Sequence, residues 1–309
     1  MRVRLHAWVL ACVFPRCAGA PSDDCAFPSH DLDEKLPLQW SGYRHGGGYD
    51  DFMVVKLKDL WKSYGGKPAL RGITLDLEPG QVLGYLGPNG AGKTTTVKIL
   101  TATLKPDQGQ ASVCGFDTIQ DPVAVKRNVG YVPEVAALYD TMTPMEYGRF
   151  IGRIHGIPSE TLDYRLETFL SIFGLHESRH DPIATFSKGM KQKVLILTAL
   201  IHNPPLIILD EPLNGLDANA TLLLKEIISQ LSLRGRTVFY CSHLLDVVEK
   251  ICHRVVILKE GAVIACGTVD EVRKQSKGQS IESTFSAMTS TTDWETVARD
   301  FVDALAGTQ

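Results

Sequence analysis

The residues with the clearest chemical potential lie in one short stretch, 87–95. Its spacing matches G-x-x-x-x-G-K-[ST], a loop whose backbone N–H groups surround a phosphate. In such a loop Lys93 offers a positive charge to the β- and γ-phosphates of a nucleotide, and Thr94 offers a hydroxyl to Mg²⁺. The predicted phosphate site consists of Gly87, Pro88, Asn89, Gly90, Ala91, Gly92, Lys93, Thr94 and Thr95.

A second candidate for chemistry is the carboxylate pair Asp210 and Glu211, which directly follows the apolar run 206–209. A carboxylate at the end of a buried strand is costly unless it meets a cation. Beside a phosphate loop, Asp210 could reach Mg²⁺ directly or through water, and Glu211 could polarise an attacking water. An acidic turn before Pro212 is the simpler alternative, and the phosphate loop makes it the weaker one.

Short strands and helices must position these residues. The apolar run 81–86 is typical of a buried strand, and 95–100 is typical of a helix start, so the helix dipole adds positive charge at the phosphate position. Other continuous apolar runs resemble parallel strands buried on both faces, namely 206–209, 238–240 and 255–258. Alternation predicts antiparallel strands at 54–60 and 73–77. Helical patterns predict an insert at about 137–202, with helices at 146–155, 160–173 and 188–201.

Composition is that of an ordinary globular protein and argues against several function classes. The chain has 309 residues, 44% of them hydrophobic, and a net charge of −3, which gives no basic balance for binding nucleic acid. No apolar run approaches the roughly 20 residues that span a bilayer, so work at a membrane would need a pore from another chain. The seven cysteines form no C-x-x-C pair, and their odd count and wide spacing are typical of reduced thiols.

The two ends of the chain differ in texture from its middle. Near the N-terminus a short apolar stretch follows two arginines in a crude secretory pattern, which Pro15 and Arg16 interrupt. We expect an N-terminal extension without fixed structure at 1–50, a nucleotide-binding domain at 51–272 and a C-terminal tail at 273–309. The tail is expected to contain a short helix at 294–305.

Further motifs follow the chain in a fixed order. They are Tyr64 in a Gly-adjacent turn, the segments 131–134, 186–193 and 214–217, and His243 after an apolar run. Each alone has a simpler interpretation, such as a helix cap or a turn residue. With the phosphate loop, and in this order, they resemble the aromatic residue, Q-loop, signature sequence, D-loop and switch histidine of the nucleotide-binding subunits of ABC transporters, over about residues 53–272.

This resemblance implies an α/β fold: a P-loop NTPase core with a mostly parallel sheet, an antiparallel β subdomain and a helical insert. It implies ATP and Mg²⁺ as cofactors, with ATP sandwiched between two subunits that face head to tail. The implied catalytic residues are Lys93, Asp210, Glu211 and His243. The residues implied at Mg²⁺ are Thr94, Glu134 and Asp210. Outside the phosphate loop, the implied nucleotide-binding residues are Tyr64, Glu134, Ser187, Gly189 and Asp217.

The chain departs from the commonest family pattern at three positions. Lys188 stands where glycine is usual, Met190 where glutamine is usual, and Glu134 replaces the Q-loop glutamine. Ser187 and Gly189, which the resemblance places nearest to phosphate, are kept. These variants resemble one branch of the family, single-domain ATPases that pair with export permeases. An extra carboxylate at Glu134 could change Mg²⁺ affinity or slow hydrolysis.

We therefore expect a cytoplasmic ATPase subunit of an ABC exporter, peripheral on the inner face of the membrane. It would work with a separate transmembrane permease, as a homodimer or a heterodimer with a related ATPase subunit, and not with nucleic acid. A soluble ABC-type ATPase that acts on ribosomes or in DNA repair is one alternative, although the chain has one ATPase core and no heptad run. A nucleotide-dependent regulatory or interaction module that hydrolyses ATP poorly is another.

Overall fold

The computed structural model describes residues 53–135, 137–243 and 245–274, with residues 285, 298–299 and 301–302 of the tail. The extension expected at 1–50 lies outside the described residues. So does most of the helix expected at 294–305.

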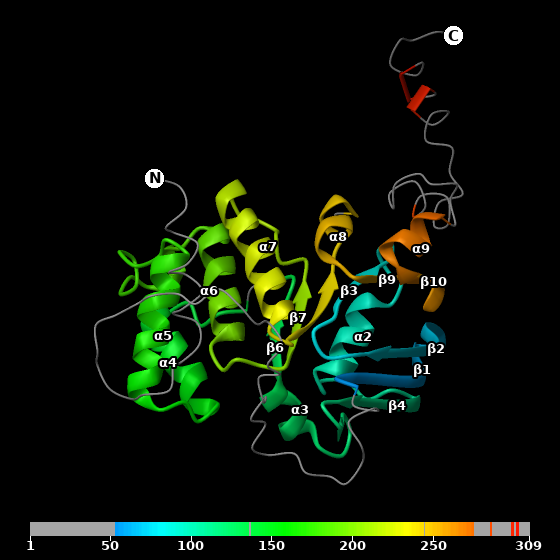
Figure 1. Ribbon diagram of the computed structural model, residues 1–309, viewed down its shortest axis with the longest axis horizontal. Helices are drawn as coiled ribbons and strands as arrows, with labels where there is room; N and C mark the ends of the chain where they lie inside the picture. Colours follow the sequence, from blue (N-terminus) through cyan, green and yellow to red (C-terminus); the bar gives the residue numbers. More distant parts are fainter. Residues whose placement is uncertain are drawn as a thin grey trace, which may run out of the picture. The chain divides into compact units, whose positions relative to one another are not determined.

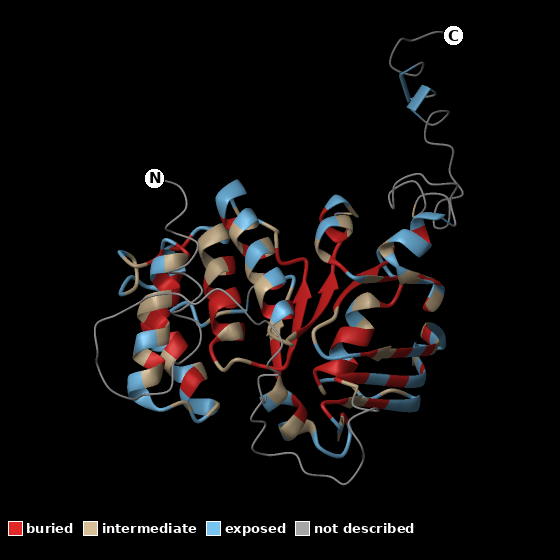
Figure 2. Cartoon of the chain, in the orientation of Figure 1, coloured by how far each residue is buried: buried red, intermediate tan, exposed pale blue. Residues whose placement is uncertain are grey.

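The larger of two sheets is mostly parallel (Figure 1). In spatial order it contains β10 (Ala262–Thr268), β9 (Arg254–Lys259), β3 (Val82–Leu86), β8 (Thr237–Cys241), β7 (Leu206–Asp210) and β6 (Val129–Val132). Only the β9–β10 pair is antiparallel. Every residue of β3, β7 and β8 is buried, and Figure 2 shows central strands of this sheet in red. This confirms the parallel strands predicted from continuous apolar runs, because such strands are covered on both faces.

The smaller sheet is antiparallel and consists of β2 (Lys67–Leu77), β1 (Val55–Tyr64), β4 (Gln108–Val113) and β5 (Phe116–Asp117), in this order. The pairing of β1 with β2 confirms the strands predicted at 54–60 and 73–77, although both are longer than predicted. Tyr64 pairs with Lys67 at the closed end of this hairpin. The alternating burial in these strands fits a sheet with one face packed and one exposed.

Helices pack on the sheets, and α2 (Lys93–Leu100) shares a hydrophobic core with both of them. The helices are α2 (Lys93–Leu100), α3 (Pro122–Asn128), α4 (Pro144–Ile154), α5 (Ser159–Ile172), α6 (Lys188–Leu200), α7 (Ala218–Leu233), α8 (Leu245–Ile251) and α9 (Val269–Lys274). A short 3₁₀ turn, η2 (Ile183–Thr185), precedes α6. Val97 and Ile99 of α2 share one hydrophobic core with Leu57 of the smaller sheet and Ile208 of the larger one. The helix that follows the phosphate loop is therefore fixed between the two sheets.

Two boundaries differ from those expected. Helix α2 begins at Lys93 and not at 95, so Lys93 and Thr94 belong to its first turn. Helix α9 spans 269–274 and so crosses the domain boundary expected after residue 272. Within the described part of the chain, no helix combines the length and apolar character needed to cross a membrane.

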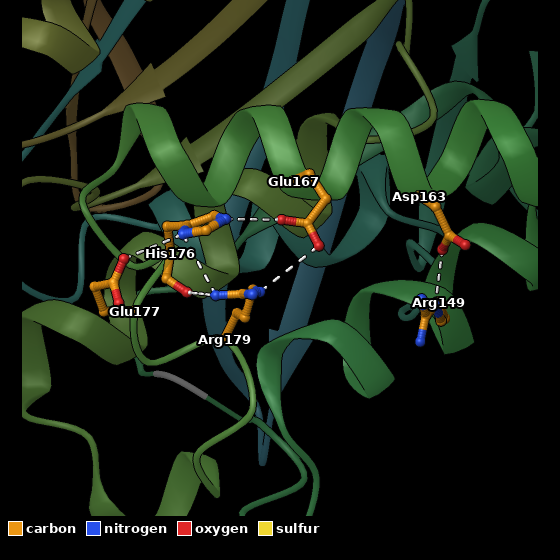
Figure 3. A network of polar contacts seen from close by, with 6 residues as sticks. All are labelled: Arg149, Asp163, Glu167, His176, Glu177 and Arg179. Atoms are coloured by element: carbon orange, nitrogen blue, oxygen red, sulfur yellow. Dashed lines mark hydrogen bonds and ion pairs between the residues drawn. The ribbon is translucent and has the colours of Figure 1, made fainter.

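Helices α4, α5 and α6 pack on one another, and α6 also packs on β6. A capping box starts α4, in which Thr143 accepts from the Glu146 N–H and the Glu146 side chain accepts from the Thr143 N–H. Figure 3 shows polar contacts between α4 and α5, and between α5 and the segment that follows it. Arg149 of α4 contacts Asp163 of α5 at 2.7 Å, and Glu167 contacts His176 at 3.1 Å. These side chains are partly exposed, so each pair contributes at most about 1 kcal/mol.

Candidate functional site

The loop between β3 and α2 has the backbone conformation of an anion cradle. Gly92 has a φ of +108°, and a Cβ there would lie 2.6 Å from the Ala69 carbonyl oxygen. At Gly90, with a φ of +81°, a Cβ would have no atom within 4 Å, so the space beside this residue is open. No side chain caps α2 at Gly92. The N–H groups of its first turn are therefore available to an anion, which also meets the positive end of the helix dipole.

Lys93 places its charge over this loop. Its Nζ donates to the carbonyl oxygens of Gly87 at 2.6 Å and Pro88 at 3.3 Å. The adjacent Thr94 is exposed, whereas Thr95 is half-buried. An ammonium group and a free hydroxyl thus flank one N–H cradle, which suits a phosphate and its counter-ion.

The carboxyl ends of β3, β8 and β7 meet at the same edge of the larger sheet, because Cys241 pairs in register with both Tyr85 and Asp210. Just beyond this row, Glu211 is buried and has a left-handed φ of +48°. Its carboxylate lies between two groups of the β8 end. His243 Nδ1 is 2.8 Å from Oε1, and Ser242 Oγ donates to Oε2 at 3.1 Å. The His243 side chain is 63% exposed, so the imidazole connects the buried carboxylate to the surface.

Asp210 ends β7 with only 3% of its surface exposed. Burial raises the pKa of Asp210 to about 6, the Glu134 and Glu211 carboxylates act in the same direction, and Lys93 opposes them. A carboxylate in this state is stabilised by any further cation placed beside it. The same interactions show that Lys93, Glu134 and Glu211 all lie near Asp210.

The remaining predicted nucleotide contacts lie on separate elements. Tyr64 is 49% exposed, and Lys62 Nζ lies 6.0 Å from its ring centre. Glu134 is also exposed, two residues after the end of β6. Tyr64 is therefore partly exposed at the sheet hairpin, while Glu134 stands with Asp210 at the sheet edge.

The signature-like segment contacts the D-loop-like segment of its own chain. Ser187 caps α6 by accepting from the Met190 N–H at 3.2 Å, and it is exposed. Gly189 packs so closely on the loop before α7 that a Cβ would lie 2.4 Å from the Gly215 carbonyl oxygen. Asp217 caps α7 by accepting from the Ala220 N–H at 2.8 Å and contacts Lys193 at 3.0 Å. The N-terminus of α6 is thus accessible to another molecule.

The donor groups present fit Mg²⁺ that arrives with a polyphosphate. Among the residues that the structure describes, no cluster of three or more His, Cys, Asp or Glu side chains could hold a metal alone. Mg²⁺ is usually bound by one or two protein oxygens together with substrate phosphates and water. A Thr94 hydroxyl and a costly buried carboxylate at Asp210 match such a donor set.

Two polar residues of the site were not predicted from the sequence. Ser242 contacts the Glu211 carboxylate, and Gln192 of α6 donates to the Pro212 carbonyl oxygen at 3.0 Å. Both side chains are buried. The available signals were position alone: Ser242 adjoins His243, and Gln192 lies inside the signature-like segment 186–193.

Comparison with known proteins identifies the family. A family model described as "ABC transporter" matches residues 70–214. The "ABC transporter ATP-binding protein NatA" of Bacillus subtilis is 36% identical over 218 residues, which are 70% of this chain and 89% of the relative. This chain belongs to the ABC transporter family. A second relative from the same organism, the "Linearmycin resistance ATP-binding protein LnrL", is 36% identical and covers 74% of this chain and 73% of its own length.

Solved structures agree with this ABC assignment. An "ATP binding subunit of ABC transporter" superimposes with a TM-score of 0.74 at 33% identity, covering 77% of this chain and all of that one (100%). A dimeric ATP-binding cassette in a post-hydrolysis state, bound to ADP and Pi, has a TM-score of 0.64 at 25% identity and covers 69% and 98% of the two chains. The expected ABC ATPase fold is confirmed.

The chain is therefore the ATP-binding subunit of an ABC transporter, and it hydrolyses ATP. The family and its curated relatives do not favour the alternative of a soluble regulatory ATPase.

Proposed function

We propose that this ATPase powers export through a separate membrane permease, from the cytoplasmic face of the membrane. Two observations support export. One curated relative is named for linearmycin resistance, and the segments around Lys188, Met190 and Glu134 resemble the export branch of the family. A helix of the permease would dock near Glu134 and the insert at 137–202.

In the proposed site the ATP phosphates lie in the loop 87–95, on the N–H groups of the loop and of the first turn of α2. Lys93 moves its three donors from the loop carbonyls to the β- and γ-phosphates. Tyr64 stacks on adenine with its exposed ring. Bound Mg²⁺ would neutralise phosphate charge, held by Thr94 and Asp210 with Glu134 nearby.

Glu211 is the proposed general base for the attacking water. Its carboxylate is already oriented by His243 and Ser242, and a general base must sit within hydrogen-bond reach of the proton that it removes. The exposed His243 can also contact the γ-phosphate and so stabilise the closed state. Orientation of the base before substrate arrives lowers the cost of reaching the reactive geometry.

A second subunit completes the site in this proposal. Ser187 and Gly189 at the N-terminus of α6 would face the γ-phosphate held by the partner, and Asp217 would align the partner's site. The exposure of Ser187 and the dimeric state of a related cassette support this arrangement. The partner would be a second copy of this chain or a related ATPase subunit.

The observation that carries the proposal is the convergence of Lys93, Asp210 and the Glu211–His243 pair at one edge of the sheet. The test is Glu211→Gln, which keeps the shape of the side chain and removes its basicity. We expect ATP to remain bound, a dimer to accumulate in size-exclusion chromatography, and turnover to fall at least 100-fold, on the order expected for loss of a general base.

The matched control is Glu160→Gln, which removes an exposed carboxylate on α5 and should leave turnover unchanged. Unchanged turnover in Glu211→Gln would remove Glu211 from the catalytic role.

A further inference from the structure

The chain leaves β7 through a constrained turn directly after the proposed general base. Glu211 adopts a left-handed φ of +48°, a conformation that non-glycine residues rarely keep unless their surroundings impose it. Its N–H donates to the Cys241 carbonyl oxygen at 2.9 Å, and its own carbonyl accepts from the Asn214 N–H at 3.2 Å. These two bonds hold the base from the β8 side and from within the turn.

The next carbonyl in this turn is held from a different element. Pro212 is buried, and its carbonyl oxygen accepts from Gln192 Nε2 at 3.0 Å. Gln192 lies on α6 with 3% of its surface exposed, among side chains of the helix that are otherwise mostly apolar. A buried amide is costly without a partner, so this single contact decides where both groups can lie.

We propose that Gln192 is a positioning residue for ATP hydrolysis, which acts by holding the turn that carries Glu211. In this proposal Gln192 acts through the turn and not by contacting the nucleotide. It fixes the Pro212 carbonyl, and through the adjacent peptide it keeps the Glu211 carboxylate between Ser242 and His243. This inference rests on the proposed role of Glu211 as general base.

Through the contact between Gln192 and Pro212, α6 would also hold the turn that carries Glu211, in addition to presenting Ser187 to the partner. Ser187 at the start of this helix is proposed to meet the partner's nucleotide, and Gln192 lies five residues, or about 1.4 turns, further along the same helix. Gly189 packs on Gly215 in the same region, so the helix start and the 211–217 loop are joined at two points.

The test is Gln192→Met, which keeps the length of the side chain and removes the donor. Steady-state ATPase activity is measured well below the thermal midpoint of each variant. We expect kcat to fall about tenfold or more while KM for ATP stays within about twofold, because the loss affects the chemical step and not nucleotide binding. A kcat equal to that of the unmodified chain would overturn the inference.

Two variants separate positioning from mere stability. Thr198→Val removes a buried hydroxyl of α6 that donates to the Val194 and Leu195 carbonyl oxygens of the same helix, so it should lower Tm without changing kcat. If Gln192→Met does not fold, Gln192→Asn retains the amide but is one methylene too short to reach Pro212, and the same split of kcat from KM is expected. Equal kcat losses in Thr198→Val and Gln192→Met would contradict the inference.

The double variant Gln192→Met with Glu211→Gln shows whether Gln192 acts through Glu211. Single-turnover rates should equal those of Glu211→Gln alone, since residues that act as one unit are not additive. Losses that multiply would overturn the inference. If Glu211→Gln alone leaves turnover unchanged, the proposed base fails; if it alone abolishes turnover and Gln192→Met changes nothing, only the positioning role fails.

Discussion

At the scale of single residues, the site combines charges that would be unfavourable apart. Lys93 is held by loop carbonyls, Asp210 is buried with a pKa raised to about 6, and Glu211 is buried with an imidazole beside it. A phosphate bound with a cation would satisfy the lysine and the buried carboxylate at once. The individual residues are therefore arranged for a ligand that carries both signs of charge.

Lys93→Met should abolish this complementarity. The variant removes the ammonium group that faces the phosphates in the proposed site. We therefore expect nucleotide affinity to fall by about tenfold or more and turnover by about 100-fold or more. A fluorescent ATP analogue and a phosphate-release assay measure the two effects. Lys98→Met removes an exposed lysine from the same helix and should change neither value; ATP binding retained in Lys93→Met would contradict the proposed site.

At the scale of elements, two histidines pack together where helices α4 and α6 of the insert end. His155 follows the last residue of α4, His202 follows the end of α6, and the two rings stack with centres 3.7 Å apart. Burial, and then the neighbouring His155, lower the pKa of His202 to about 4. Arg127 and Arg165 add positive charge nearby, so this junction is built for neutral imidazoles.

Stability should therefore fall in mild acid. The unfolded chain binds a proton at His202 near pH 6.5, and the folded chain does so only near pH 4. The contribution of His202 to the free energy of unfolding is thus complete above pH 6.5, and about 3 kcal/mol of it is lost as the pH falls from 6.5 to 4. Denaturant titrations across this range measure the slope.

His202→Phe keeps a flat ring and removes the titrating group, so the slope between pH 6.5 and 4 should flatten. His180→Phe alters an exposed histidine and should leave the slope as it is. An equal slope in His202→Phe and in the unmodified chain would show that this junction does not set the acid response.

At the scale of the whole molecule, one chain carries the two proposed half-sites on different elements. The loop 87–95 and the carboxylates lie at the ends of β3 and β7, whereas Ser187 lies at the start of α6, where Gly189 packs on the D-loop-like segment of the same chain. A head-to-tail pair would use one half-site from each subunit. Such a shared site can be tested by mixing two variants, each inactivated in a different half-site.

A mixture of Lys93→Met and Ser187→Arg chains should recover ATPase activity. Each is inactive alone, but the mixed pair contains one site with an intact lysine and an intact serine. Phosphate release at increasing ratios of the two chains measures the recovery, which should reach up to about a quarter of the activity of the unmodified protein by random pairing.

A mixture of Lys93→Met with Asp210→Asn is the control, because both changes affect the same half-site and no intact site can form. Recovery in the control mixture, or none in the test mixture, would argue against sites shared between subunits.

Much of this protein followed from local patterns. The phosphate loop and the strand that ends in Asp210 depend on residues close together in sequence, so their spacing predicted them. Longer apolar runs predicted β3, β7, β8 and β9 for the same reason. The four-residue strand β6 and the edge strand β10 were not predicted, because one is very short and the other lacks regular alternation of buried residues.

Only the tertiary structure decided what surrounds Glu211. Its partners Ser242 and His243 lie more than 30 residues away in sequence, and Gln192 reaches the same turn from another helix. The raised pKa of Asp210 likewise depends on burial and on carboxylates from other elements. Residue types determine which chemistry is possible, but a pKa or an oriented carboxylate depends on long-range neighbours that no local spacing specifies.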